Sequence, residues 1–293
     1  MLDFVKSKRF NAPFAVNYDI TWRCNLRCVH CYYWRSIEQL GIAHRELTSG
    51  EWHEEFLRAR AAGAHSASLT GGEPTLRMDV IRDAYNIFPI IQIATNGVKK
   101  VPEDIKCCIW VSIDGDEEIH NKIRGATIYQ KVLENISGDK RVAISTTLTT
   151  ENYDQVLTIT RQMKMVGVRG IFFMLFSGSK SDPLYLTNEK FESVITGIQR
   201  AKKEFPNFVF HSQKMVKNLC NKPHANNCVF LRKQPLIRSF FADLTPKRCV
   251  MGDNVDCATC TCIVPLTAYV LRPLHFDMET FREMQHILYS GKN

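Results

Sequence analysis

The chain has no long run of apolar residues. None approaches the roughly 18 residues that a membrane-spanning helix requires, and no repeats or low-complexity segments occur. The start of the chain, Met1 to Arg9, lacks the pattern of a secretory signal peptide. We therefore expect at most peripheral membrane contact.

Cysteine, in contrast, is abundant, with 11 residues among 293. A disulfide framework is typical of short secreted chains, but this chain is long enough, and with 45% hydrophobic residues apolar enough, to build a full core. The cysteines also cluster along the sequence. Clustering favours metal ligation, and hence a reducing, cytoplasmic location.

The charge balance is moderately basic, with a net charge of +8. This charge is compatible with an anionic substrate, a membrane surface or an acidic electron donor such as flavodoxin or ferredoxin. A surface that merely carries more Lys than Glu explains the charge at least as well. We expect no nucleic acid partner.

Three cysteines lie close together in the stretch Cys24-Asn-Leu-Arg-Cys28-Val-His-Cys31. The β-prone run 14–21 precedes them, so the cysteines should lie in the loop after a strand. Thiolates at this density suit an iron–sulfur cluster, and three ligands on four irons leave one iron open. A zinc knuckle or unligated thiols are the structural alternatives.

A second motif, Gly71-Gly72-Glu73-Pro74, follows another strand-like run at 66–70. Two glycines allow the backbone to approach a ligand closely, although this motif alone would also fit an ordinary turn. Together the two motifs resemble the signature of the radical S-adenosylmethionine (SAM) superfamily.

The resemblance implies a [4Fe–4S] cluster on Cys24, Cys28 and Cys31, with the open iron chelated by SAM. It also implies that His30, the residue before the third cysteine, lies at the cofactor. The segment from Gly71 to Pro74 would then bind the amino group of SAM through its carbonyls and Glu73.

Strand and helix patterns alternate over the first two thirds of the chain. Because the strands are mostly apolar, they should be parallel and buried on both faces. This pattern predicts an α/β fold with a partial (βα)6 TIM-like barrel and chemistry at the strand ends, although a doubly wound sheet would also fit. We expect strands at 14–21, 66–70, 90–95, 107–113, 142–148 and 170–176, and helices at 51–62, 78–88, 128–136, 153–166 and 188–204.

Polar residues at the ends of the third and fourth strands extend the resemblance. Family members hydrogen-bond the ribose and carboxylate of SAM where this chain has Asn96, Ser112 and Asp114; turn chemistry is the alternative role. The stretch 118–125 resembles the H-D-x-x-R-G motif of a branch that includes peptide maturases, with Asn121 in place of Asp. Arg124 is the candidate for the SAM carboxylate, since a guanidinium matches a carboxylate bidentately.

The last ninety or so residues depart from the alternation, which predicts a barrel domain at 1–205 and a cysteine-bearing extension at 206–293. We expect a second metal site in this extension if 228–249 folds as a hairpin. An additional iron–sulfur cluster, a zinc site and buried thiols are the alternatives. The expected ligands are Cys228, Cys249, Cys257 and Cys260, with Cys262 as the substitute.

The extension resembles two forms within the superfamily. One is the short "twitch" domain that binds an auxiliary cluster, and the other is the tail of hopanoid-pathway adenosyltransferases. A terminal amphipathic helix should pack on the barrel, although its apolar face could also contact lipid. That face comprises Met278, Phe281, Met284, Gln285 and Leu288.

The resemblance implies an enzyme in which a 5′-deoxyadenosyl radical abstracts hydrogen from a substrate or adds to it. The substrate would be a small molecule, a lipid or a peptide. The first interpretation is an isoprenoid or lipid-like substrate. The second is a dehydrogenase or peptide maturase with an auxiliary cluster, and the third is a non-catalytic iron–sulfur protein.

Overall fold

In the computed structural model, the described residues are 13–35, 45–225, 228–253 and 255–288. An eight-stranded sheet forms the centre, with the order β6-β5-β4-β3-β2-β1-β7-β8. Its first six strands are parallel and follow one another in sequence order. They are β1 (Ala15–Asp19), β2 (Ser66–Thr70), β3 (Ile90–Thr95), β4 (Cys108–Ser112), β5 (Val142–Leu148) and β6 (Gly170–Leu175).

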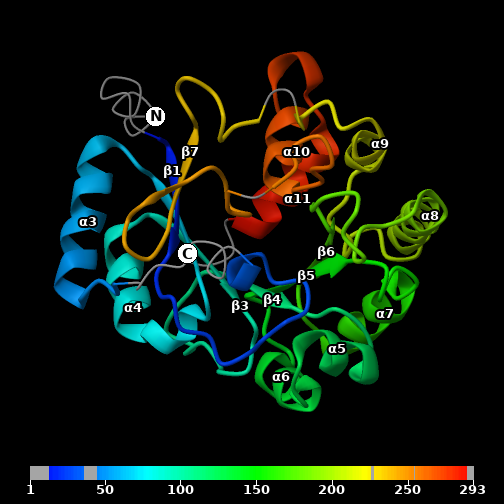
Figure 1. Ribbon diagram of the computed structural model, residues 1–293, viewed down its shortest axis with the longest axis horizontal. Helices are drawn as coiled ribbons and strands as arrows, with labels where there is room; N and C mark the ends of the chain where they lie inside the picture. The colour runs from blue at the N-terminus through cyan, green and yellow to red at the C-terminus, as the bar shows by residue number, and fades with distance from the viewer. Residues whose placement is uncertain (1–12, 36–44, 226–227, 254, 289–293) are drawn as a thin grey trace.

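Helices cover the outer face of this curved sheet (Figure 1). They are α3 (Ser49–Ala62), α4 (Met78–Ile87), α5 (Glu117–Arg124), α6 (Tyr129–Ile136), α7 (Val156–Val166) and α8 (Asn188–Glu204). The expected partial (βα)6 barrel is therefore confirmed, although the connection between β3 and β4 contains no helix.

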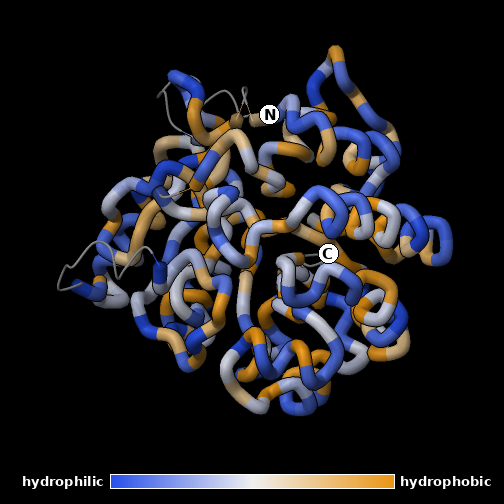
Figure 2. Tube along the Cα trace, turned by 45° about the vertical axis from the view of Figure 1, so that its right-hand side comes forward, coloured by the Kyte–Doolittle hydropathy of each residue, from blue (hydrophilic) through white to orange (hydrophobic). Residues whose placement is uncertain are grey.

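Local sequence explains the boundaries of these elements. At the start of α3, Thr48 and Glu51 form a capping box, and Gly63 ends the helix in the left-handed conformation. Side chains along β3, and along β5 from Ile144 onward, alternate between a fully buried outer face and a half-buried inner face. Apolar segments accordingly follow the strands, whereas the helices mix polar and apolar residues (Figure 2).

The C-terminal part completes the sheet on the side of β1. β7 (Ile237–Phe240) pairs with β1 in parallel, and β8 (Pro246–Lys247) pairs with β7 in antiparallel, so a hairpin lies within 228–249. After α8, Val209 forms one isolated parallel bridge with Ile171 of β6.

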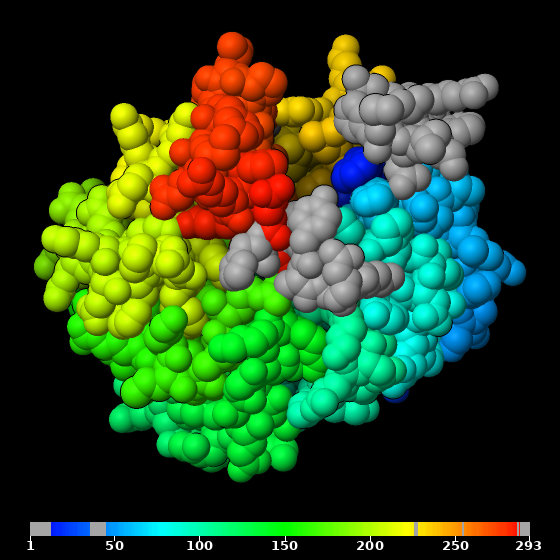
Figure 3. Space-filling view, turned by 180° about the vertical axis from the view of Figure 1, so that it is seen from behind, coloured from blue at the N-terminus to red at the C-terminus, as the bar shows by residue number. Residues whose placement is uncertain are grey.

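Three helices complete the extension: α9 (Gln213–Asn221), α10 (Ile263–Val270) and α11 (Met278–Leu288). From behind, α10 and α11 lie against α8 and α9 (Figure 3). On α11, Met284 packs against the core, whereas Met278 and Phe281 are 51% and 38% exposed. Within the described residues, no helix combines the length and the apolar character needed to cross a membrane.

Candidate functional site

Cys24, Cys28 and Cys31 lie in the cysteine loop, residues 20–31, directly after β1, and their side chains are partly buried. Burial raises the pKa of Cys24 to about 11 and also raises the pKa values of Cys28 and Cys31. The backbone N–H of Leu26 donates to the thiol of Cys24, and the backbone N–H groups of Tyr33 and Trp34 donate to the thiol of Cys31. Such thiols remain protonated at neutral pH until a metal draws off the proton. The donor set therefore fits a thiolate-bound metal centre.

The two glycines after β2 lie directly against the cysteine loop. The backbone N–H of Gly72 donates to the carbonyl of Thr21 (2.9 Å), and that of Glu73 donates to the carbonyl of Arg23 (2.8 Å). A Cβ on Gly72 would lie 2.1 Å from the Arg23 oxygen, and Gly71 has a φ of 126°. The close approach that the glycines permit is therefore to the cysteine loop itself.

Glu73 is buried, and its carboxylate accepts four hydrogen bonds. Oε1 accepts from the backbone N–H of Thr75 (3.0 Å) and from the hydroxyls of Thr75 and Thr95 (2.6 Å each). Oε2 accepts from the backbone N–H of Asn96 (2.8 Å). Glu73 thus connects the ends of β2 and β3, a role that the sequence did not suggest.

Asn96 connects β3 to the cysteine loop. Its Nδ2 donates to Oδ1 of Asn25 (2.8 Å), and its Oδ1 accepts from the backbone N–H of Val98 (3.0 Å). The amide is therefore engaged within the chain, next to Cys24.

Asp114, after β4, is completely buried at the centre of a charged group. Its Oδ2 lies 2.6 Å from Nη2 of Arg124 and 3.7 Å from Nε2 of His30. Nη1 of Arg124 lies 3.7 Å from Sγ of Cys28. The structure therefore brings four of the residues expected at the site into one contact network.

Burial governs the protonation of this network. It would raise the pKa of Asp114, but Arg124 and His30 outweigh it and lower that pKa. For His30, burial lowers the pKa to about 4, so the imidazole is neutral near pH 7. The network therefore has one carboxylate and one guanidinium, and its charges balance.

Ser112, Ser145 and Thr147 lie on the half-buried inner faces of β4 and β5. Beside them, the indole of Trp110 donates to Oε1 of Gln92 (2.7 Å). The inner face near the cysteine loop is thus lined with small polar side chains.

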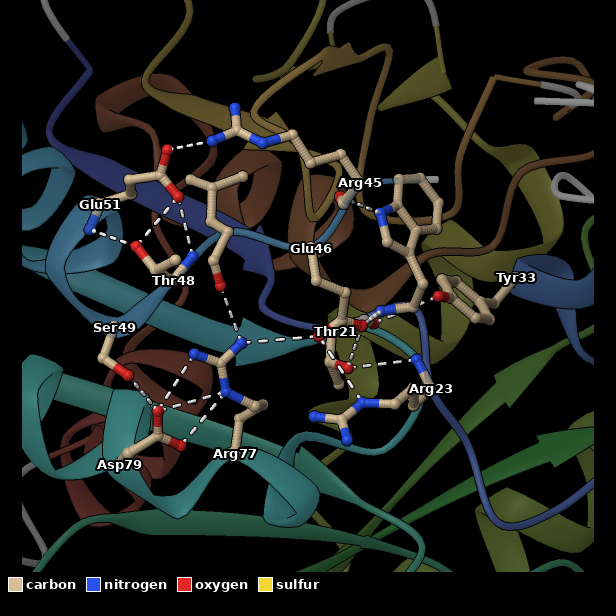
Figure 4. Close-up of polar contacts among 12 residues, drawn as sticks. Thr21, Arg23, Tyr33, Arg45, Glu46, Thr48, Ser49, Glu51, Arg77 and Asp79 are labelled. Carbon is tan, nitrogen blue, oxygen red and sulfur yellow. Dashed lines mark hydrogen bonds and ion pairs between the residues drawn. The ribbon is translucent and has the colours of Figure 1, made fainter. Parts of the chain in front are cut away.

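Glu46 supports the cysteine loop from outside and was not anticipated, because an isolated Glu carries no sequence signal. Its Oε1 accepts from the hydroxyl of Thr21 (2.6 Å) and from the backbone N–H of Trp22 (2.7 Å). Its Oε2 lies 3.6 Å from Arg23 and 3.5 Å from Arg77 (Figure 4). These contacts fix the chain where it leaves β1.

A buried ion pair at the end of β1 was also not anticipated. Nζ of Lys247, on β8, lies 2.7 Å from Oδ1 of Asp19, and both side chains are fully buried. The ammonium also lies 5.5 Å from the ring of Tyr32, the neighbour of Cys31. This pair joins the extension to the barrel beside the cysteine loop.

The C-terminal cysteines line a single cavity in the extension, together with His224. Burial raises the pKa values of the thiols of Cys228, Cys249 and Cys260, and neighbouring thiols of the cavity raise them further. Backbone N–H groups lie at several of the thiols, including that of Cys262 at Sγ of Cys260 (3.4 Å). The cysteines of this cavity are Cys228, Cys249, Cys257, Cys260 and Cys262.

His224 lines the same cavity and is completely buried. Its Nε2 lies 3.2 Å from the carbonyl oxygen of Cys260, which can only accept, so Nε2 carries the proton. A lone histidine in a polar stretch gave no signal of this position.

Comparison with known proteins adds a family match. The family described as the Radical SAM superfamily matches residues 18–212. An AdoMet-dependent heme synthase of Methanosarcina barkeri is 27% identical over 212 residues, which cover 66% of this chain and 60% of that protein.

Two further similarities concern a sequence and a fold. A PqqA peptide cyclase of Bradyrhizobium diazoefficiens is 28% identical over 122 residues, 38% of this chain and 31% of that protein. SuiB of Streptococcus suis, in its complex with the precursor peptide SuiA, is similar with a TM-score of 0.61 at 14% identity, covering 96% of this chain and 70% of SuiB. The chain thus spans less than two thirds of the two curated relatives.

Proposed function

The chain belongs to the radical SAM superfamily, a family of enzymes that use a [4Fe–4S] cluster and SAM, and we propose that it oxidises its substrate with the help of a second iron–sulfur cluster. Cys24, Cys28 and Cys31 would hold the first cluster. When bound, that cluster supplies the electron that splits SAM into methionine and a 5′-deoxyadenosyl radical.

The residues around the cysteine loop would position SAM. Arg124, held by Asp114 at 2.6 Å, would bind the carboxylate of SAM, and the carbonyls of Gly71 and Gly72 would bind its amino group. Ser112 and the neutral imidazole of His30 would contact the rest of the molecule. The barrel would exclude water, which protects a radical from side reactions.

The single observation that carries the proposal is the cavity lined by Cys228, Cys249, Cys257 and Cys260. After the radical removes a hydrogen atom, the substrate must still lose one electron and one proton to become a stable product. A second cluster on these four thiols would accept that electron. Iron is favoured over zinc at this site by analogy with the superfamily.

A peptide substrate is the class we favour. It is supported by the similarity to a PqqA peptide cyclase and by the fold shared with SuiB, which was solved with a precursor peptide. No feature of the described residues favours an isoprenoid or lipid-like substrate in the same way. We further propose a reducing compartment, since the cysteines cluster along the sequence as metal ligands would.

Metal analysis tests the two-cluster proposal. After anaerobic reconstitution, the variant with Cys24, Cys28 and Cys31 replaced by Ala should retain about four irons per chain but form no 5′-deoxyadenosine from SAM. The matched variant with Cys228, Cys249, Cys257 and Cys260 replaced should also retain about four, and should still cleave SAM. One zinc in place of iron, or no metal in the first variant, would refute the second cluster.

A further inference from the structure

The basic charge of the chain is concentrated in the extension. Residues 206–275 contain nine Lys and Arg residues and three Asp residues, a net charge of +6 of the +8 of the whole chain. A surplus of Lys spread evenly over the surface would not produce this distribution.

One of these cations lines the cavity of the C-terminal cysteines, and two others lie in the adjoining strand and loop. Arg248 lines the cavity, and the register of β7 and β8, in which Ser239 pairs with Lys247, places Arg238 directly opposite Arg248. Lys233 lies in the loop that starts at Cys228 and is closed by a hydrogen bond from Leu236 to Val229 (3.1 Å). All three cations are exposed.

These cations are available to a partner. Among the described residues, no Asp or Glu oxygen lies within 4.0 Å of the charged groups of Lys233, Arg238 or Arg248. Asp253 accepts from the backbone N–H of Arg248 and not from its guanidinium in the described part of the chain. The same hairpin and its preceding loop expose two apolar side chains, Leu231 (45%) and Leu236 (42%).

We propose that this basic face, formed by Leu231, Lys233, Leu236, Arg238 and Arg248, binds an acidic electron-transfer protein. The inference rests on the proposed second cluster. In turnover, the cluster on the four cysteines would pass the electron that it takes from the substrate to the oxidised partner, and no covalent bond forms or breaks. The reverse transfer, from reduced partner to oxidised cluster, uses the same docking face.

The position of the charge favours a redox partner over an acidic peptide. Electron transfer requires that the partner dock next to the cluster, and Arg248 lines that cavity. A small face that combines cations with a few apolar side chains suits weak, transient redox complexes, and opposite charges accelerate such encounters.

The experiment uses the variant without Cys24, Cys28 and Cys31, so that only the second cluster can be reduced. Reduced flavodoxin, an acidic flavoprotein, is mixed with it, and the loss of the visible absorbance of the cluster is followed by stopped flow. Adding Lys233→Glu, Arg238→Glu and Arg248→Glu should slow this reduction by about 10-fold or more at low salt and remove its salt dependence.

A matched control carries Lys99→Glu, Lys106→Glu and Lys203→Glu, which reverse three exposed cations of the barrel. It should be reduced as fast as its parent, and dithionite should reduce all three proteins equally. Equal rates of reduction by flavodoxin in both charge-reversed proteins would overturn the proposal. If the first set of substitutions weakened the binding of an acidic peptide and left the rate with flavodoxin unchanged, the proposal would fall in the same way. Absence of iron in the parent would instead refute the second cluster itself.

Discussion

At Gly72, the backbone of another segment occupies the space that a side chain would need. The cysteine loop depends on this packing, since its carbonyls at Thr21 and Arg23 accept from Gly72 and Glu73. The sequence drew attention to the glycine motif through its expected contact with a ligand, which stays a prediction. A backbone neighbour from another segment cannot be read from a motif.

We expect Gly72→Ala to abolish cluster retention, because its Cβ would lie 2.1 Å from a backbone oxygen that cannot rotate away. Gly50→Ala is the control, since nothing lies within 4 Å of that Cβ in α3, and the change should stabilise the helix by about 0.5–1 kcal/mol. Iron content after reconstitution and guanidinium unfolding are the measurements. A fully loaded Gly72→Ala protein would contradict this account.

Arg124 gives a second prediction at this scale. Losing its contact with the SAM carboxylate in Arg124→Gln should cost about 1.5–3 kcal/mol, or about 10- to 150-fold in SAM affinity. Because the single change leaves Asp114 buried without its cation, Asp114→Asn combined with Arg124→Gln is the matched variant. Equilibrium binding of SAM to reconstituted protein provides the measurement, and unchanged affinity in both variants would give Arg124 a purely structural role.

At the scale of elements, the sequence predicted most of the barrel because its signals are local. Capping at Thr48 and apolar runs at the strands identify these segments without tertiary information. The short β7 was missed, since four residues carry little periodicity and its pairing with β1 is non-local. The helix expected from Tyr153 begins only at Val156, because Asn152 accepts from the backbone N–H of Thr149 (2.7 Å) and so holds a turn there.

The packing of α11 on α8 should depend on pH. Burial raises the pKa of Glu283 to about 7, although its contact with Lys202 lowers it. A carboxyl with a raised pKa stabilises the fold at pH values below its unfolded pKa and loses that contribution as the pH rises through 7. The side chain in Glu283→Gln stays neutral at every pH. The difference in the free energy of unfolding, variant minus parent, should therefore increase by about 1–2 kcal/mol between about pH 5.5 and pH 8.5.

Denaturant titrations of both proteins across this range are the measurement for α11. Lys202 retains Glu279 at 3.0 Å in the variant, so the comparison does not leave a buried cation alone. A stability difference between the two proteins that is constant with pH would show that Glu283 is charged throughout.

At the scale of the whole molecule, barrel and extension share one sheet. The sheet continues from β1 into β7 and β8, while the matched family region ends at residue 212. The boundary at 205/206 therefore remains a prediction about domains, and the extension reaches the barrel through hydrogen-bonded strands as well as through packed helices. The sequence could indicate a cysteine-rich extension but not its attachment, since Asp19 and Lys247 carry no motif.

The pair of Asp19 and Lys247 should hold the two parts together. Lys247→Met would leave Asp19 buried without a cation, at a cost of about 3–5 kcal/mol, whereas Lys247→Met combined with Asp19→Asn should recover most of that loss. Guanidinium unfolding of the four proteins gives the interaction energy as a double-mutant cycle. Lys247 stands two residues before Cys249, and its ammonium lies 5.5 Å from the ring of Tyr32, which follows Cys31. The single variant should therefore also lose iron from both cysteine sites, and additive effects with full iron content would show that the extension is held by its other contacts.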